Sequence, residues 1–226
     1  MREILGRRRT TRWALRDAAL FCTTRWGWPV LPGVAARESR RLTARQSGQP
    51  RGRCSCPRPD CAVPGAHPFD PGLLAATTDA RMVRWWWTNR PDAPVLLATG
   101  GRAPCALSLP AAAGVRALEE FDRRGLRTGP VIATPTRFAL LVAPYDLEEL
   151  GELLHAQDWV PSSLRFHGEG GYVPLPPSRT GDGQVGWERP PTLVGGLMWL
   201  PRMEPLLDVL VRASAEVPDT GSRLAY

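Results

Sequence analysis

The sequence contains no lysine, and all 29 of its Lys/Arg residues are arginines. Together with 22 glycines and 24 prolines, this bias indicates a GC-rich coding genome, so the arginine content alone says little about function. Long apolar runs are also missing, and none approaches the ~20 residues that a membrane-spanning helix needs. Neither a hydrophobic segment nor a cleavage site with small residues follows the basic N-terminus. We therefore expect a soluble, cytoplasmic protein without a membrane partner.

Charge is unevenly distributed along the 226 residues. Residues 1–60 hold 14 arginines and 4 acidic residues, whereas residues 61–226 hold 15 arginines and 18 acidic residues. A basic segment on a near-neutral body is a common sign of nucleic-acid contact, although a solvated tail gives the same pattern. Since 43% of the residues are hydrophobic, a sizeable core can be buried. We expect a basic arm at 1–13, one domain at 14–200, and a C-terminal helix and tail at 201–226.

Hydrophobic spacing and capping signals predict that helices and strands alternate. The expected helices lie at 12–26, 79–90, 110–124, 146–157 and 201–216. The expected strands lie at 28–32, 94–100, 103–109, 129–136 and 137–144, and residues 162–178 read as a strand, a glycine turn and a second strand. This order favours an α/β or α+β fold with a mixed sheet flanked by helices.

Soft metal ligands gather in the loop at 51–72. Its spacing is Cys54-x-Cys56-x4-Cys61-x5-His67, which holds three of the five cysteines within fourteen residues. Three thiolates and an imidazole suit tetrahedral zinc, whereas a disulfide is the weaker interpretation for a cytosolic protein. The prolines and glycines allow a short loop to fold back and present four ligands. Because the protein fills all four positions, this Zn²⁺ would be structural and would not activate water.

Several segments resemble one protein family, in the right order. "AALFCTTRWGWPVLP", "CSCPRPDCAVPGAHP", "LLAATTDARMVRWWWTNRPDAPVLLATG" and "HGEGGYVPLPPSR" resemble the N-terminal domain of bifunctional DNA primase/polymerase (prim-pol) proteins in the archaeo-eukaryotic primase superfamily. The particular resemblance is to small actinobacterial-type members with a zinc loop, and it covers roughly residues 14–190. It implies a prim-pol-like α/β domain built around a mixed sheet, with a zinc-bound loop on one side and a role in DNA replication.

The resemblance also implies where two catalytic metals would bind. Family members carry an Asp-x-Asp or Asp-x-Glu pair on the strand after the "ATG" turn, where alternate residues point the same way. Ser108 and Pro110 stand at these positions, and no acidic residue occurs between Asp92 and Glu119. Neither side chain can replace a carboxylate as a ligand of Mg²⁺.

Two further family positions have also lost their functional side chain. Ala139 stands in the "TPTRFALLVAP" segment, where the family has a histidine that contacts the triphosphate. Arg165 stands where a further aspartate precedes the Gly-Gly-Tyr turn. The sequence therefore predicts a catalytically degenerate domain, a pseudoenzyme that uses neither Mg²⁺ nor Mn²⁺.

Other residues remain candidates for contact with nucleotide or nucleic acid. Thr180 replaces a histidine that is frequent in the family's triphosphate corner, which weakens the case for the neighbouring residues. The candidates are Arg7, Arg8, Arg9, Arg12, His167, Ser178 and Arg179.

Three functions stay open at this point. The first is a non-catalytic prim-pol-like protein that binds single-stranded or template DNA, or a nucleotide. The second is an active primase or polymerase with relocated ligands such as Glu169, although Glu119 and Glu120 are adjacent on a helix and cannot face one site. The third is a zinc-stabilised module that presents tryptophans from residues 85–87 to a protein partner, since the three cannot all point inward.

Overall fold

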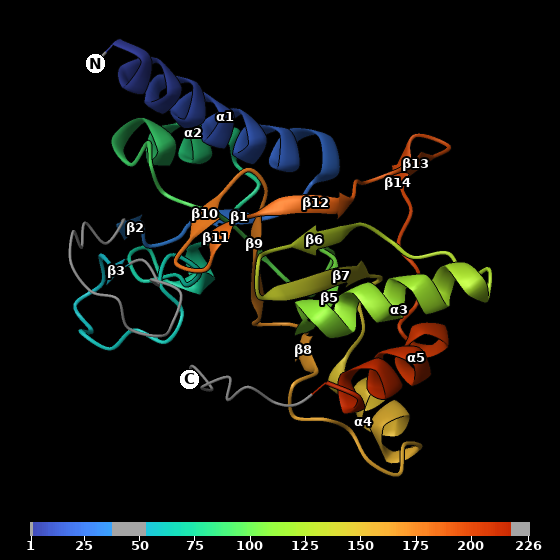
Figure 1. The fold of residues 1–226 in the computed structure, drawn as a ribbon. Coiled ribbons are helices and arrows are strands. Elements are labelled where there is room, and N and C mark those ends of the chain that lie inside the picture. Colours follow the sequence, from blue (N-terminus) through green and yellow to red (C-terminus); the bar gives the residue numbers. More distant parts are fainter. Residues whose placement is uncertain (1, 38–52, 218–226) are drawn as a thin grey trace.

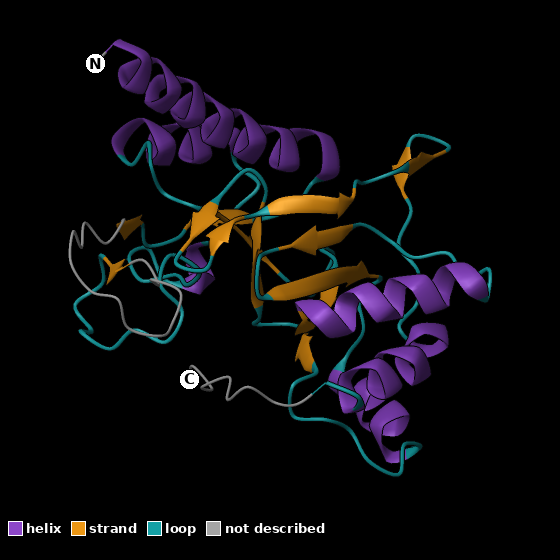
Figure 2. Ribbon diagram, viewed as in Figure 1, coloured by secondary structure: helices purple, strands orange, loops and turns teal. Residues whose placement is uncertain are grey.

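The computed structural model describes residues 2–37 and 53–217, which form two antiparallel sheets with helices packed around them (Figure 1). Figure 2 shows the helices in two groups, one on each side of the strands. The helices are α1 (Arg2–Trp26), α2 (Ala80–Asn89), α3 (Ala111–Arg123), α4 (Leu147–His155) and α5 (Glu204–Ala215), with a short 3-10 turn, η1 (Leu73–Ala75).

The larger sheet has five strands in the order β12-β6-β7-β5-β8, and the smaller has three in the order β1-β4-β9. The larger sheet consists of β12 (Gly186–Arg189), β6 (Val131–Ala133), β7 (Arg137–Val142), β5 (Cys105–Pro110) and β8 (Arg165–His167). The smaller consists of β1 (Val30–Pro32), β4 (Val95–Ala98) and β9 (Tyr172–Leu175). Short pairs are formed by β2 (Ala36–Arg37) with β3 (Arg53–Cys54), β10 (Arg179–Thr180) with β11 (Gly183–Gln184), and β13 (Leu193–Val194) with β14 (Leu197–Met198).

The larger sheet buries both of its faces, because alternate residues of a strand point to opposite sides. On β5, Cys105, Leu107 and Leu109 pack into the core under α3, α4 and α5. Ala106, the alternate residue, belongs to a second core beneath α1, α2 and the smaller sheet. Ser108 points to the same side as Ala106, toward the space between the two sheets.

Helix α2 begins after an Asp79 cap, and its tryptophans divide between core and surface, as expected for residues 85–87. The Asp79 carboxylate accepts hydrogen bonds from the Arg81 and Met82 amides, which satisfies two amides that have no partner within the helix. Trp86 and Trp87 are 5% and 2% exposed, whereas Trp85 is 58% exposed. One tryptophan therefore faces outward while its two neighbours pack in the core.

The α+β class is confirmed, but the sheets differ from the expected mixed sheet. Every strand pair in the described ranges is antiparallel. The strands on either side of the glycine turn at 168–171 do not form a hairpin: β8 pairs with β5 of the larger sheet, and β9 pairs with β4 of the smaller one. This turn carries the chain from one sheet to the other.

Helix α1 begins at Arg2, earlier than expected, so the backbone of the basic N-terminal residues continues the helix that packs on α2 (Figure 1). The side chains of residues 2–12 lie outside the described part of the structure. None of the described helices is long and apolar enough to cross a membrane.

Candidate functional site

The four candidate metal ligands of the loop lie together in space. Their ligand atoms, the sulfurs of Cys54, Cys56 and Cys61 and a ring nitrogen of His67, all lie within 4.8 Å of one another. His67 Nε2 is 3.3 Å from both the Cys54 and the Cys61 sulfur. These separations match those between ligands of one tetrahedral ion, so the four residues could hold a metal.

The backbone fixes the orientation of the His67 ring. Its Nδ1 donates to the Pro68 carbonyl oxygen at 2.8 Å, which leaves the lone pair of Nε2 directed at the thiols. Such a hydrogen bond on the far nitrogen is typical of metal-bound histidine. The donor set fits a structural metal, with Nε2 and three sulfurs as its ligands.

The metal loop packs against the β10–β11 hairpin. The Gly181 amide donates to the Pro64 carbonyl oxygen at 2.6 Å. On its other side, the Val34 amide donates to the His67 carbonyl oxygen at 3.0 Å. The loop is thereby held between the hairpin and the segment that leads into β2.

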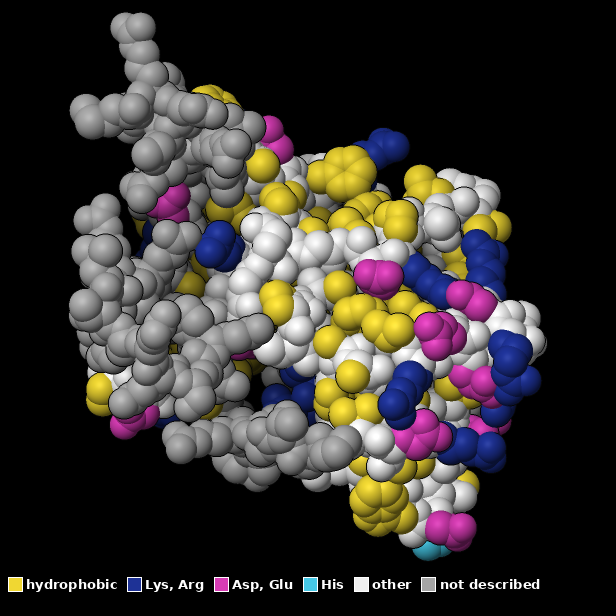
Figure 3. Space-filling view, in the orientation of Figure 1, with side chains coloured by type: hydrophobic (Ala, Val, Ile, Leu, Met, Phe, Trp, Pro, Cys, Tyr) yellow, Lys and Arg dark blue, Asp and Glu magenta, His cyan; other side chains and the backbone are white. Residues whose placement is uncertain are grey.

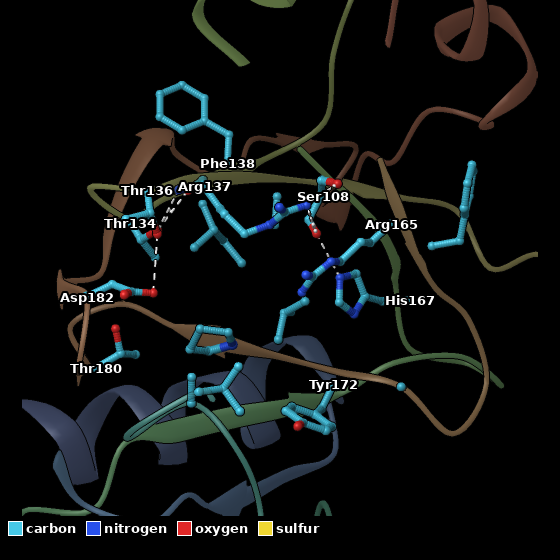
Figure 4. A pocket seen from close by; sticks show the side chains of 18 of the residues that line it. Ser108, Thr134, Thr136, Arg137, Phe138, Arg165, His167, Tyr172, Thr180 and Asp182 are labelled. Carbon is cyan, nitrogen blue, oxygen red and sulfur yellow. Dashed lines mark hydrogen bonds between the residues drawn. The ribbon is translucent and has the colours of Figure 1, made fainter. Parts of the chain in front are cut away.

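A cleft of about 530 Å³ opens between the two sheets (Figure 4). One wall is the face of the larger sheet that carries Ser108, and the opposite wall is β9. Thr180 and Asp182 of the hairpin and Val63 and Ala66 of the metal loop complete the lining. The cleft is therefore shared by four parts of the chain that are distant in sequence.

Three of the positions at which family chemistry was expected form one row across the larger sheet. Ser108 of β5 pairs with Ala139 of β7 on one side and with Arg165 of β8 on the other. All three line the cleft. Pro110, the second carboxylate position, is the last residue of β5 and pairs with Arg137. The row thus carries a hydroxyl, a methyl and a guanidinium group where the resemblance implies a carboxylate, an imidazole and a further carboxylate.

Arg137 is fixed against the wall of the cleft. Its Nη2 donates to the carbonyl oxygens of Ser108 and Ser163, at 2.8 and 2.7 Å, and to the Ser108 hydroxyl at 3.3 Å. The side chain runs along the wall toward Ser108, while the Arg165 guanidinium points into the cleft (Figure 4). The positive charge of Arg137 thus lies beside Ser108 on the wall of the cleft.

His167 contacts Ser108 and is uncharged. Its Nε2 is 2.9 Å from the Ser108 hydroxyl oxygen. Burial, followed by the charges of Arg137 and Arg165, lowers the pKa of His167 to about 4, so the imidazole is uncharged at pH 7. Since a guanidinium only donates, the Ser108 hydroxyl oxygen accepts from Arg137, and it also forms the hydrogen bond with His167 Nε2.

A serine hydroxyl on a histidine nitrogen is also the arrangement of an activated nucleophile. Here, a histidine with a pKa of about 4 is a weak base at neutral pH. The Ser108 oxygen is also engaged by Arg137, which draws electron density away from it. This pair is better suited to holding the cleft wall together than to attacking a substrate.

The remaining sequence candidates occupy different surroundings. Ser178 is fully buried, and its hydroxyl bonds to the Val95 amide and carbonyl oxygen, at 2.8 and 3.4 Å, so it joins the hairpin to β4 and does not line the cleft. Arg179 lies exposed on β10. The side chains of Arg7, Arg8, Arg9 and Arg12 are outside the described residues.

Two charged residues of the cleft, Arg137 and Asp182, were not predicted from the sequence. Arg137 is the first residue of the apolar strand predicted at 137–144. Asp182 lies in a glycine-rich stretch with no predicted strand, and its Oδ2 accepts from the Thr136 hydroxyl at 3.2 Å. The pairing of β5 with β7 reveals the role of Arg137, and no local pattern in the sequence signals that pairing.

Two facing sheets, a cleft between them and a Cys₃His loop at its edge define an α+β domain with a ligand-sized site. The family model for the bifunctional DNA primase/polymerase N-terminal domain (Prim-Pol) matches residues 19–219. The chain therefore belongs to the Prim-Pol family. The matched residues reach further toward the C-terminus than the resemblance at 14–190 and include α5. No curated protein and no solved structure matches the chain.

Proposed function

We propose that this chain is a prim-pol-like domain that binds nucleotide or single-stranded nucleic acid but does not carry out two-metal nucleotidyl transfer. The observation that carries the proposal is the row formed by Ser108, Ala139 and Arg165. Two-metal transfer needs anionic oxygens that hold Mg²⁺ ions ~4 Å apart. Guanidinium groups beside a neutral serine and a proline repel a divalent cation from the same place.

Relocated catalytic carboxylates are the alternative. Within 2–37 and 53–217, the Cys₃His loop is the one group of three or more potential ligands that could hold a metal. Glu169 is exposed on the turn between the sheets and does not line the cleft. Asp182 does line it, but on the hairpin, away from the Ser108 row. This arrangement favours a non-catalytic domain over an active polymerase.

The metal of the Cys₃His loop is proposed to be zinc, because three sulfurs and one imidazole nitrogen form a set that zinc binds tetrahedrally. Its role would be structural, since four protein ligands leave no open position for water or substrate. The hydrogen bond from His67 to Pro68 and the loop's contact with Gly181 support this role.

A protein-interaction module is the second candidate, favoured by exposed aromatic side chains on α1 and α2. Trp13, Phe21 and Trp85 are 54%, 49% and 58% exposed. Aromatic residues of this kind are enriched at interfaces with other proteins, and they also stack on the bases of single-stranded nucleic acid. Dependence of binding on salt separates these two interpretations.

Purified protein is expected to show no nucleotide incorporation in primer extension or in de novo dinucleotide synthesis, with either Mg²⁺ or Mn²⁺ and with enzyme in excess. The reason is that the transition-state charge would have no bound metal to stabilise it. Metal-dependent incorporation that survives Ser108→Ala but is lost in Glu169→Gln would contradict the proposal and place the ligands at the turn between the sheets.

Single-stranded DNA is expected to bind with an affinity that falls steeply as salt rises, because arginines release counterions from the phosphates. Replacing Arg7, Arg8, Arg9 and Arg12 by glutamine keeps helix-forming residues in α1. It should reduce the slope of log K against log salt by up to about 3, from ~0.7 per lost phosphate contact. Fluorescence anisotropy of a labelled oligonucleotide measures this slope.

The matched control removes four exposed arginines that pair with acidic residues elsewhere: Arg116, Arg123, Arg202 and Arg212. Figure 3 shows basic and acidic side chains interspersed over the helices on that side of the molecule. The control should leave the slope nearly unchanged. Binding that is indifferent to salt would favour the protein-partner candidate.

A further inference from the structure

We infer that the cleft binds the phosphate groups of a nucleoside triphosphate directly through Arg137 and Arg165, without a divalent metal. This inference rests on the proposed function and specifies the ligand of the same site. It assigns to the two guanidinium groups the task that bound metal ions perform in a metal-dependent polymerase, namely neutralising the phosphates.

Sheet register places one arginine beside each expected carboxylate position. Ser108 pairs with Arg165 of β8, and Pro110 pairs with Arg137 of β7. Residues directly opposite in an antiparallel pair have Cβ atoms about 4.5–5.5 Å apart. Each arginine therefore lies directly opposite a β5 position at which a metal ligand was expected. The β5 residues at these positions, Ser108 and Pro110, carry no charge.

The charges of the cleft favour an anion. Its lining contains two arginines and one acidic residue, Asp182, which lies on the hairpin and accepts from Thr136. His167 faces Ser108 from β8 and is neutral at pH 7, so it adds no charge. The described lining therefore carries one net positive charge, in a partly buried place where charge is poorly screened.

Guanidinium groups suit this task geometrically. A guanidinium such as that of Arg165 has N–H donors in a planar fork that matches two phosphate oxygens, which an ammonium group cannot do. Arg137, whose Nη2 donates to the carbonyl oxygens of Ser108 and Ser163, contributes its positive charge and its remaining N–H donors. The carbonyl oxygens of Ser108 and Ser163 hold Arg137 in position, so little conformational freedom remains to be lost on binding. The site is thus organised before a ligand arrives.

The cleft also has room for the nucleoside. Its volume of about 530 Å³ lies within the range of small-molecule sites, about 300–1,000 Å³. Ile132, Tyr172, Val173 and Pro174 give the part away from the arginines an apolar and aromatic lining. A base can pack there while the phosphates reach the guanidinium groups.

Such a site responds to Mg²⁺ in the opposite sense to a polymerase site. Free triphosphate carries more negative charge than its Mg²⁺ complex, and Mg²⁺ occupies the phosphate oxygens that the arginines would contact. Added Mg²⁺ should therefore weaken binding, whereas it strengthens binding wherever protein carboxylates share the metal with the phosphates.

The test is calorimetric titration of the full chain with dATP in buffer free of divalent cations. No chelator is added to the protein, so that the Cys₃His loop keeps its metal. Excess Mg²⁺ is expected to lower the affinity by roughly tenfold or more, and 2′-deoxyadenosine, which lacks phosphate, should not bind measurably. Arg165→Gln should lower the dATP affinity by roughly tenfold or more, since charged hydrogen bonds are lost.

Arg165→Lys and Arg212→Gln sharpen the test. The first keeps the charge but loses the fork, so it should bind dATP with an affinity between those of the wild type and Arg165→Gln. The second removes an exposed arginine that pairs with Asp208 on α5, and it should bind dATP like the wild type. Arg165→Gln is the main variant because Arg137 also bonds to the backbone of Ser108 and Ser163, so that its replacement would disturb the fold. A thermal melt of the Arg165→Gln protein verifies that this variant is folded.

The outcomes distinguish the inference from the proposed function. Binding that is strengthened by Mg²⁺, or that is unaffected by Arg165→Gln, overturns the inference but leaves nucleotide binding in place. No dATP binding in either buffer also overturns it, and the salt-dependent DNA assay then decides the proposed function separately. Metal-free binding that Mg²⁺ and Arg165→Gln both weaken supports the inference.

Discussion

Cys56→Ser is expected to yield protein without bound zinc and with a clearly lower melting temperature. A serine hydroxyl is a poor replacement for a thiolate on zinc, and three remaining ligands hold the ion far less tightly. Loss of a structural metal belongs to the most destabilising class of point changes, at about 4 kcal/mol or more. In a chain of this length that corresponds to a fall in Tm of roughly 8–16 °C.

Elemental analysis measures the metal, and thermal unfolding followed by circular dichroism measures Tm. The wild type should contain about one zinc per chain, as the four-ligand argument requires. Ser55→Ala is the matched control, because Ser55 is exposed between two ligands and its side chain is not among them. Wild-type protein that lacks metal, or Cys56→Ser protein with an unchanged Tm, would refute the structural metal.

Gly100→Ala is expected to destabilise the fold by about 3 kcal/mol or more. Gly100 has a positive φ of 92°, and an added Cβ would lie 2.3 Å from Glu169 Cα and 2.6 Å from Glu169 N. Both of these atoms belong to the backbone, so no side-chain rotation relieves the clash. The turn that joins the two sheets must shift, and β8 with His167 shifts with it.

Gly101→Ala is the control for the backbone conformation alone. Gly101 also has a positive φ, of 62°, but an added Cβ would meet nothing within 4 Å among the described residues. That substitution should cost only about 1 kcal/mol, the strain of a left-handed alanine. Urea unfolding measures both variants. Equal destabilisation of the Gly100→Ala and Gly101→Ala variants would mean that the Glu169 backbone does not clash with a side chain at position 100.

The sequence predicted the helices best, because their signals are local. The helices expected at 79–90 and 146–157 begin at side-chain caps, Asp79 and Asp146, and the Asp146 carboxylate accepts from the Glu149 amide at 2.8 Å. The start of α1 was placed too late, since an arginine-rich segment shows little amphipathic pattern. The Cys₃His cluster was also predicted, because its ligands are close together in sequence.

Pairing between distant strands could not be predicted in the same way. The β10–β11 hairpin and β12 lie in a stretch rich in glycine and proline, in which apolar alternation is interrupted. The placement of β8 and β9 in different sheets depends on how the Gly100 turn packs on Glu169, a contact between residues 69 positions apart. The cleft and its arginines arise from these pairings, which is why Arg137 was not recognised.

Residues inferred from the resemblance had mixed outcomes in space. Ser108, Ala139 and Arg165 came from three separate segments, and the structure brings them to one row. Ser178 came from a fourth segment, and its hydroxyl is turned toward the Val95 backbone in the core. A resemblance assigns a position along the chain, but the direction of a side chain depends on packing around it.

The contact between Pro64 and Gly181 has a thermodynamic consequence. Val63 and Ala66 of the metal loop and Thr180 and Asp182 of the hairpin line the same cleft, so folding of the loop and the shape of the cleft are coupled. Coupling of this kind is reciprocal: a molecule that prefers the ordered cleft must raise the affinity of the loop for its metal, and the bound metal must raise the affinity for that molecule by the same factor. Zinc availability would then set the fraction of the protein that is competent to bind.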